Sequence, residues 1–507
     1  MDPRSLARQA FEVATLFSRF GEVIAGTPRE HLLLNEARSF LDGYCDDIRI
    51  EYVPVTSWEE ELCIVEANGF RYVCALQPPI AGVIDVEAPH VVVDARTVVE
   101  KEIDLRGCIA VIKDVEDPDD YPLIASKCAE RGALGVVILD RWGTLRRIVT
   151  IRTFLPTYRE AEHVPIPVVV VAHEAYPHEG RTRIFAKARV YESHGANLVC
   201  DAHQRYENFL YVTAHHDHWF SGFSDNLLGV SIVLVLARHF RKVFRCNTRF
   251  VLFTAEEGFP SPIASFYWLV GSRYHVLKNI EFILENVLAV LNFDTILRGK
   301  PKVCASGVEL QEVIRGLFPD LELDFDQIIF DSFSFSSIGI PSLTVQTFEE
   351  VLREGIYHSS MDTPEKVSMN TIEQVFALIH AIAKTLDTEF LFSTFLKSLP
   401  YIAVKRFPEQ VPTLEFTNAL LKVSRTFNDL PIRRKLSIIK TFNRIGYACY
   451  VTKKFFEELG ERESCEVLPW KEGVLEVPTN VRYDTIRDVR ERFLSIAYAL
   501  ELLVDAR

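Results

Sequence analysis

The residues best suited to chemistry lie in the stretch FLYVTAHHDHWFSGFSD, at 209–225. An apolar run of strand-forming residues ends in His215 and Asp217, and a glycine-containing loop then leads to Asp225. Because side chains two residues apart on an extended chain point the same way, Asp217 can orient His215 while the other imidazole nitrogen binds a metal ion. Taken alone, the same stretch is also typical of a solvated polar loop that closes a core strand.

Carboxylates end two later strand patterns. RFVLFTAEEG ends in Glu256 and Glu257, and VLAVLNFDT ends at Asp294. Successive side chains diverge along a strand, so one Glu can bind a metal ion while its neighbour faces the substrate as a base. The loop YHSSMDTPEKV adds His358 and Asp362. An acidic turn or a surface histidine would explain each group singly, but their recurrence along one α/β unit is the arrangement that a metal site requires.

The elements that must position these residues alternate between strand and helix patterns. The strand pattern at 209–214 precedes an amphipathic helix pattern at 227–240, and further strand patterns lead to a helix pattern at 371–386. In open α/β sheets, ligands bind outside the carboxyl ends of the strands. The sequence therefore predicts an α/β fold with the chemistry at one edge of a sheet.

The flanking regions show other secondary-structure patterns. Two helix patterns, around Leu6–Phe20 and Arg29–Tyr44, open the chain. From about Val83 many short β patterns follow, with one helix among them, which predicts a mostly β module inserted into another domain. Beyond about Ser393 helical periodicity dominates, and we expect a separate helical domain there.

Composition and charge argue against several classes of partner and location. The chain has 507 residues, a net charge of -14 and no basic stripe, which argues against nucleic acid or an anionic membrane as the main partner. No apolar run reaches membrane-spanning length, and the opening MDPRSLARQAFEV reads as an amphipathic helix that lacks the apolar core of a signal peptide. The ten cysteines form no CxxC pairs, so we expect reduced thiols and a cytoplasmic location. Only three methionines hint at a heat-adapted source.

The ordered motifs resemble a known family. HxD, then DN before a helix, EE after a strand, NxD and YHSSxDT are the pattern of the co-catalytic bi-zinc aminopeptidases, which are related to glutamate carboxypeptidases and the non-catalytic transferrin receptors. FGEVIAGTPRE resembles the opening helix of that family, and DLRGCIAVI followed by AERGALGVVI resembles its protease-associated domain. The likeness runs over roughly residues 20–390.

The resemblance implies three domains. A zinc-exopeptidase domain, with a mixed β-sheet flanked by helices, would be formed by residues 1–67 and 193–392. A mostly β protease-associated domain at 68–192 would be inserted into it, and residues 393–507 would form a C-terminal helical domain.

The resemblance also implies two Zn²⁺ ions per chain, which Co²⁺ or Mn²⁺ could replace. The implied ligands are His215 and Asp294 for one ion, Glu257 and His358 for the other, and Asp225 between both.

Roles follow for three more residues. Glu256 would be the general base, Asp217 would orient His215, and Asp362 would act similarly near His358. No family role follows for His216 and His218, which we interpret as surface or packing histidines.

Two segments depart from the family or border its site. The run GFPSPIASFYWLV stands where the family has a short turn, and Phe266, Tyr267 and Trp268 within it either wall the substrate pocket or, as we favour, form helix core. In DSFSFSSIGIPSL, we expect Ser334 or Phe335 to border the substrate.

The leading hypothesis is a zinc-dependent aminopeptidase that hydrolyses N-terminal residues from short peptides with a metal-activated water. A carboxypeptidase or dipeptidase of the glutamate carboxypeptidase type is the first alternative, because Arg298, Lys300 and Arg353 lie near the motifs in sequence. A receptor-like binding protein is the second, although such relatives have lost ligands that this chain keeps. The expected partners are a peptide substrate and a second copy of the chain, through the C-terminal helical domain.

Overall fold

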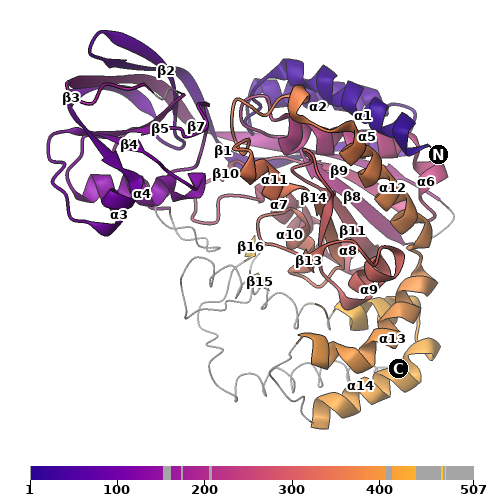
Figure 1. Ribbon diagram of the computed structural model, residues 1–507. Helices are drawn as coiled ribbons and strands as arrows, with labels where there is room; N and C mark the ends of the chain where they lie inside the picture. Colours follow the sequence, from indigo (N-terminus) through magenta and orange to yellow (C-terminus); the bar gives the residue numbers. More distant parts are fainter. Residues whose placement is uncertain are drawn as a thin grey trace.

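The computed structural model describes residues 2–151, 161–172, 175–204, 208–406, 414–440, 443, 470–471 and 474–475. An α/β domain and a smaller, mostly β module lie side by side, and helices of the C-terminal region lie below the α/β domain (Figure 1). The helical domain was predicted at 393–507, and most of its residues beyond 440 lie outside the described residues.

A mixed sheet forms the centre of the α/β domain. Neighbouring β8, β9, β11 and β14 are parallel, whereas β7 and β12 pair antiparallel to them at the two sides. In sheet order the strands are β7 (Arg181–Ala202), β9 (Asn247–Phe253), β8 (Phe209–His215), β11 (Val287–Phe293), β14 (Ser342–Gln346), β12 (Lys302–Ala305) and β13 (Leu323–Phe325). Every residue of the four parallel strands is buried, as expected for strands covered on both faces. The predicted α/β fold with a mixed sheet is confirmed.

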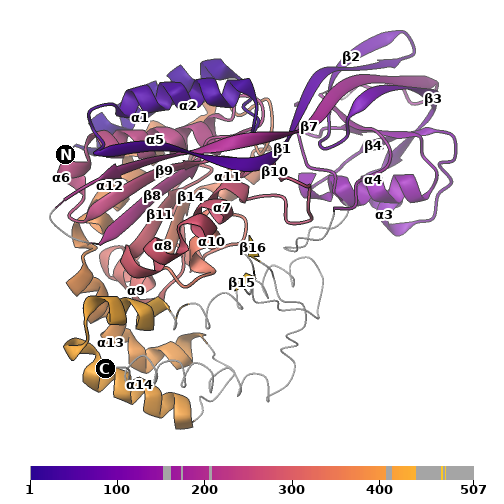
Figure 2. The same ribbon diagram turned by 180° about the vertical axis from the view of Figure 1, so that it is seen from behind.

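Helices cover both faces of this sheet (Figures 1 and 2). One face packs against α1 (Pro3–Phe17), α2 (Pro28–Leu41), α5 (Leu228–Arg238), α6 (Phe240–Val243) and α12 (Met369–Thr385). The other packs against α7 (Val270–Lys278), α8 (Ile280–Asn286) and α10 (Ser332–Ser336), while α9 (Val308–Leu317) and α11 (Phe348–Arg353) lie near the β12 edge. The first helix begins after Asp2, whose side chain accepts the Arg4 N–H, and has a proline in its first turn.

The inserted module is a closed ring of strands. In ring order these are β1 (Asp47–Ala67), β2 (Phe70–Leu76), β6 (Val168–Val171), β5 (Gly135–Leu139), β4 (Ile109–Lys113), β3 (Gly82–Asp94) and β7, which pairs back to β1. Besides the expected helix, α4 (Tyr121–Glu130), the module contains a short second helix that we did not predict, α3 (Ala95–Glu100).

The two long strands β1 and β7 connect the module to the α/β domain. They pair antiparallel from Asp47 and Asp201 to Ala67 and Thr182, and both run through the two parts without interruption (Figure 2). The short β10 (Phe259–Pro260) adds to β1. The predicted domain boundaries at 67/68 and 192/193 therefore fall at the end of one long strand and inside the other.

Disulfides accompany these strands, contrary to the expected reduced thiols. Cys45 pairs with Cys200 of β7, and Cys63 of β1 pairs with Cys74 of β2. The first pair is 155 residues apart in sequence, so its proximity follows from the pairing of β1 with β7 and has no local sequence signal.

The C-terminal region begins with α13 (Thr388–Arg406) and α14 (Leu414–Thr426). Leu391, Phe395 and Val423 join the main hydrophobic cluster of the α/β domain. Lys440 Nζ donates to the backbone oxygen atoms of Ile283 and Leu284, at 3.1 and 2.6 Å, and so caps the end of α8. A two-stranded pairing of β15 (Trp470–Lys471) with β16 (Val474–Leu475) completes the described elements. Within the described residues, no helix has the length and apolar character needed to cross a membrane.

Candidate metal centre

The predicted ligands meet at the carboxyl ends of the parallel strands. His215 is the last residue of β8, Glu257 follows β9, and Asp294 directly follows β11. Asp225 lies in the segment η3 (Phe223–Leu227) that precedes α5, where its own backbone is not helical, and His358 lies in the loop after α11. The sheet thus gathers side chains that are far apart in sequence, as the strand-end argument predicted.

Asp225 lies between two imidazole–carboxylate groups. Its Oδ1 is 3.4 Å from His215 Nε2, which is also 3.6 Å from Asp294 Oδ2. Its Oδ2 is 3.6 Å from His358 Nε2, which is also 2.7 Å from Glu257 Oε1. One carboxylate that offers a different oxygen to each group has the geometry needed to bridge two metal ions.

The donor set fits a metal ion. His215, Asp225 and Glu257 offer ligand atoms that all lie within 4.8 Å of one another. Asp225 Oδ2 is buried and has no hydrogen-bond partner among the described residues. An orphaned buried oxygen is costly without a partner, and a divalent cation would supply one. Imidazole mixed with carboxylate is a donor set that suits zinc.

The Asp217 carboxylate fixes the backbone of the Glu256–Glu257 pair. Its carboxylate accepts the backbone N–H groups of Glu256 and Glu257, at 3.0 and 3.1 Å. His215 Nδ1 instead lies 3.0 Å from the backbone oxygen of Asp217 and 4.0 Å from its Oδ1. The orientation of His215 therefore comes from the Asp217 backbone, and the Asp217 carboxylate fixes the two glutamates.

Asp362 likewise acts on a residue other than the one expected. Its carboxylate accepts the backbone N–H groups of Ser224 and Asp225, with its oxygen atoms at 2.8–3.0 Å. Burial raises the pKa of Asp362 to about 7, although these bonds lower it. We expected Asp362 near His358, but its hydrogen bonds orient Asp225.

The adjacent glutamates have different surroundings. Glu257 Oε2 accepts the Trp219 indole N–H at 3.1 Å, while its Oε1 faces His358. Glu256 is 7% exposed, and burial followed by the charges of Glu257 and Asp294 raises its pKa well above the ordinary value. Burial alone would lower the pKa of His215, but the carboxylates of Asp294 and Glu256 outweigh it and raise that pKa.

The two unassigned histidines are buried. His216 Nε2 lies 3.0 Å from Glu30 Oε1, and Glu30 Oε2 accepts the Gly26 N–H at 2.7 Å. His218 lies between the backbone oxygen atoms of Gly21 and His216, each 2.9 Å away. Both are therefore packing histidines and not surface ones. Sequence reasoning missed Glu30, which contacts His216 and the Gly26 N–H. The signal that could have pointed to it is TPRE, a capping-box sequence at the start of a helix.

The aromatic residues of the insertion, Phe266, Tyr267 and Trp268, differ in their burial. Phe266 is fully buried, and Trp268, 8% exposed, donates its indole N–H to the Ile328 oxygen at 2.9 Å, as expected for core residues. Tyr267 is half-buried, and burial together with the charges of Asp119 and Glu257 raises its pKa. Tyr267 also packs edge-on against Trp268, with ring centroids 5.2 Å apart, so the aromatic run supports the fold.

The expectation for Ser334 and Phe335 is wrong. Phe335 is fully buried and stacks edge-on against Tyr211 beneath the sheet, because α10 turns that side chain into the core. Ser334 is also buried and shares a hydrogen bond with Ser272 at 2.8 Å.

Asp331 is a buried carboxylate that sequence reasoning did not single out. Neither of its buried carboxylate oxygens has a hydrogen-bond partner by distance and angle within the described residues. Burial raises its pKa to about 7, and it lies close enough to His215 and Asp294 to interact with their charges. Its only sequence signal was its place at the start of DSFSFSS, where a helix cap is the simpler interpretation.

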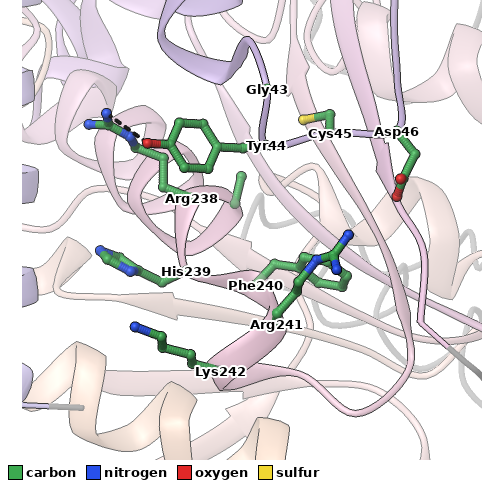
Figure 3. Close-up of a pocket in the computed structure, with 10 residues that line it drawn as sticks. Gly43, Tyr44, Cys45, Asp46, Arg238, His239, Phe240, Arg241 and Lys242 are labelled. Carbon is green, nitrogen blue, oxygen red and sulfur yellow. Dashed lines mark hydrogen bonds between the residues drawn. The ribbon is translucent and has the colours of Figure 1, made fainter.

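A separate cavity of about 290 Å³ lies between α5–α6 and the segment after α2. Arg238, Arg241 and Lys242 line it, but Figure 3 shows that their side chains point in different directions. Arg238 is already bound to the Tyr44 hydroxyl at 3.2 Å. The cavity therefore offers no convergent anion site.

Comparison with known proteins agrees with the fold described above. Residues 197–383 match the model of peptidase family M28. BSAP, a zinc aminopeptidase from Bacillus subtilis, is similar in structure, with a TM-score of 0.58 and 20% identity over 74% of this chain and 94% of that one. A peptidase M28 precursor from Shewanella amazonensis SB2B gives a TM-score of 0.58 with 17% identity over 75% and 95% of the two chains.

The aminopeptidase from Aneurinibacillus sp. strain AM-1 gives a TM-score of 0.51 with 16% identity over 76% and 96%. No curated protein matches the chain. The structural likenesses, all at low identity, establish the fold. The family match over residues 197–383 confirms the resemblance recognised in the sequence and supports the predicted class of enzyme, a metallo-exopeptidase.

Proposed function

We propose that this protein is a zinc-dependent aminopeptidase with two ions per chain that releases N-terminal residues from short peptides. The observation that carries the proposal is the position of Asp225, whose two oxygen atoms face His215 and His358 separately. His215 with Asp294 and His358 with Glu257 would complete the two ion sites, and Co²⁺ or Mn²⁺ could replace zinc.

When bound, the ions would polarise the scissile carbonyl and make a water acidic enough to attack it. Glu256 would take the proton of that water and pass it to the leaving amine. The hydrogen bonds from the Glu256 and Glu257 backbone to Asp217 support these roles, because they fix base and ligand relative to each other.

The charge of the centre supports recognition of an α-ammonium group. Once two divalent ions offset the charge of their ligands, Glu256 and Asp331 would remain, when ionised, to attract an α-ammonium group and repel a free carboxylate. The cations considered for the carboxypeptidase alternative are engaged elsewhere. Arg298 bonds the Lys366 oxygen at 2.9 Å, Lys300 bonds the Asp320 oxygen, and Arg353 pairs with Glu350.

Peptides with free or blocked ends test this proposal. We expect release of N-terminal residues, with large apolar ones preferred, and resistance of N-acetylated peptides, because acetylation removes the ammonium charge. The Glu256→Gln variant, purified in the same way, controls for contaminating peptidases. Cleavage of N-acetylated peptides from the carboxyl end, with amino-acid anilides untouched, would assign the protein to the carboxypeptidase alternative.

Partners and location are part of the same proposal. We expect a peptide as substrate, and a homodimer through the C-terminal helical region, which a sedimentation measurement would test. A cytoplasmic location remains a prediction. The two disulfides bear on it, since such bonds persist in oxidising compartments and in intracellular proteins of hyperthermophiles.

A further inference from the structure

A segment of the inserted module holds the loop that carries His358. Arg147 N donates to the His358 oxygen at 3.0 Å, and Ser360 N donates to the Leu145 oxygen at 2.8 Å. The Thr144 and Ser360 hydroxyl groups share a further bond of 2.8 Å. Residues 144–147 and 358–360 thus pair like two short antiparallel strands, one from each part of the molecule.

Arg146 strengthens this contact with its side chain. The guanidinium is fully buried and donates from Nε to Asp140 Oδ2 at 2.8 Å, within the inserted module. Its Nη2 donates to the Gly355 oxygen at 2.7 Å, and its Nη1 donates to the Tyr357 oxygen. A single side chain therefore joins the module to two backbone groups directly before His358.

The loop needs this support because its backbone is in an unfavourable conformation. His358 has a φ of 51°, in the left-handed region that non-glycine residues seldom adopt. Such a conformation is energetically unfavourable and persists where the surroundings fix it. Tyr357 stacks on the His358 ring with centroids 3.7 Å apart and packs against the core of the inserted module.

Gly355 fits closely against the same module. It has a φ of 65°, and a Cβ atom there would lie 2.3 Å from the Trp142 ring. Arg146 lies over that ring in turn, at 5.0 Å from its centroid. Both ends of the 355–358 segment are therefore packed on the inserted module.

We infer that Arg146 is a positioning residue for the proposed metal ligand His358, so that the inserted module completes one of the two ion sites. This inference rests on the proposed function. The guanidinium fork serves the carboxylate and both backbone oxygens from three separate nitrogen atoms in fixed directions, a geometry that the single nitrogen of a lysine does not match. Loss of Arg146 should weaken the ion between Glu257 and His358 and leave the ion between His215 and Asp294 in place.

Stepwise metal titration of the apo-protein tests the inference. Zinc affinities are measured in competition with a chromogenic chelator, and the visible spectrum of the Co²⁺ form reports the second ion. For Arg146→Ala we expect the first ion to bind within about twofold of wild type. The second should bind about 10–100-fold more weakly, which is the usual effect of losing a group that orients a ligand.

Arg131→Ala is the matched control. Arg131 also lies in the inserted module and donates to a backbone oxygen, that of Val98, but this bond stays inside the module. Both affinities should match wild type in this variant. Added methylguanidine should restore the second affinity in Arg146→Ala, which a general loss of packing would not allow.

A second variant covers the case in which Arg146→Ala does not fold. Ser360→Ala removes the bonds to Thr144 and to Leu145 N at the exposed end of the contact. It should weaken the second ion in the same direction by a smaller factor. The inference would be overturned if the folded variants bound both ions with wild-type affinity, or if both ions were weakened equally. Either result would leave the proposed function standing. A wild-type chain that binds no divalent metal would overturn the proposed function as well.

Discussion

Adjacent residues of one type can have separate roles because the backbone fixes them in different environments. Glu257 uses both oxygens, one toward His358 and one toward Trp219. Glu256, the residue before it in the bend that follows β9, is buried, and its pKa is raised by burial and by the neighbouring carboxylates. Asp217 accepts the backbone N–H of both glutamates, so their relative positions depend on one buried carboxylate.

Glutamine substitutions should separate the two roles. Glu256→Gln should keep both metals and the fold but lower kcat about a hundredfold to ten-thousandfold, because the proton acceptor is lost. Glu257→Gln should instead reduce metal content, since an amide is a poorer ligand than a carboxylate. Elemental analysis and kcat are measured on the same samples. Metal loss in Glu256→Gln with full metal in Glu257→Gln would show that ligand and base have been exchanged.

Sequence reasoning brought together the chemical groups of the site but not the contacts that orient them. Three of the ligand candidates, His215, Glu257 and Asp294, end or follow strand patterns, and a parallel sheet brings strand ends to one edge. The bonds of Asp362 to Asp225, and of Arg146 to the His358 loop, join segments more than 130 residues apart. No local periodicity reports such contacts, and Asp331 was missed for the same reason.

At the scale of elements, a buried ion pair joins three strands. Arg249 of β9 binds Asp201 of β7 with two hydrogen bonds of 2.5 and 2.7 Å, and Arg49 of β1 adds one of 2.9 Å. Burial by itself would raise the pKa of Asp201, but the two arginines lower it. Because the folded-state pKa is lowered, the stabilisation is present above the unfolded pKa and is lost as the pH falls through the folded one.

Asp201→Asn should therefore reduce stability in a pH-dependent way. At pH 7 the variant should lose about 3–5 kcal/mol, because Arg249 remains buried without its partner charge. The difference from wild type should narrow below about pH 4, near the unfolded pKa of an aspartate. Urea unfolding at pH 7, 5 and 3 measures both effects. A difference that is constant with pH would exclude a charge-dependent contribution.

Element types were predicted well where patterns are long. The helix pattern around Leu6–Phe20 corresponds to α1, and the apolar run at 209–214 to β8. The sequence did not predict that β1 and β7 run through both parts of the molecule. A strand keeps the same two-residue side-chain alternation when its neighbouring strands change, so the pattern does not report the change. The disulfides were missed with it, since they depend on which strands become neighbours.

At the scale of the whole molecule, the α/β domain shares its core with the C-terminal region. Phe395, Val423 and Ile439 are fully buried in the same cluster as the helices α1, α5 and α12. Asn443 also donates to Glu309 Oε1 at 2.7 Å. The C-terminal region is therefore more than an appended module.

Removal of residues from Ser393 onward should destabilise the protein or dissociate a dimer. The truncation exposes apolar helix faces that must be buried against something. We expect aggregation, or a smaller species in size-exclusion chromatography, with a lower Tm in differential scanning calorimetry. A monomeric, fully active and equally stable truncation would refute this role.

The central claim is that Asp225 bridges two metal ions, and elemental analysis of the purified protein tests it most directly. Wild type should contain close to two divalent metals per chain, lose activity with a chelator and regain it with zinc or cobalt. Asp201→Asn, which changes a buried aspartate away from the centre, should keep both ions. Asp225→Ala should lose them, because one carboxylate would contact both. Tight binding of two ions in Asp225→Ala would contradict the account.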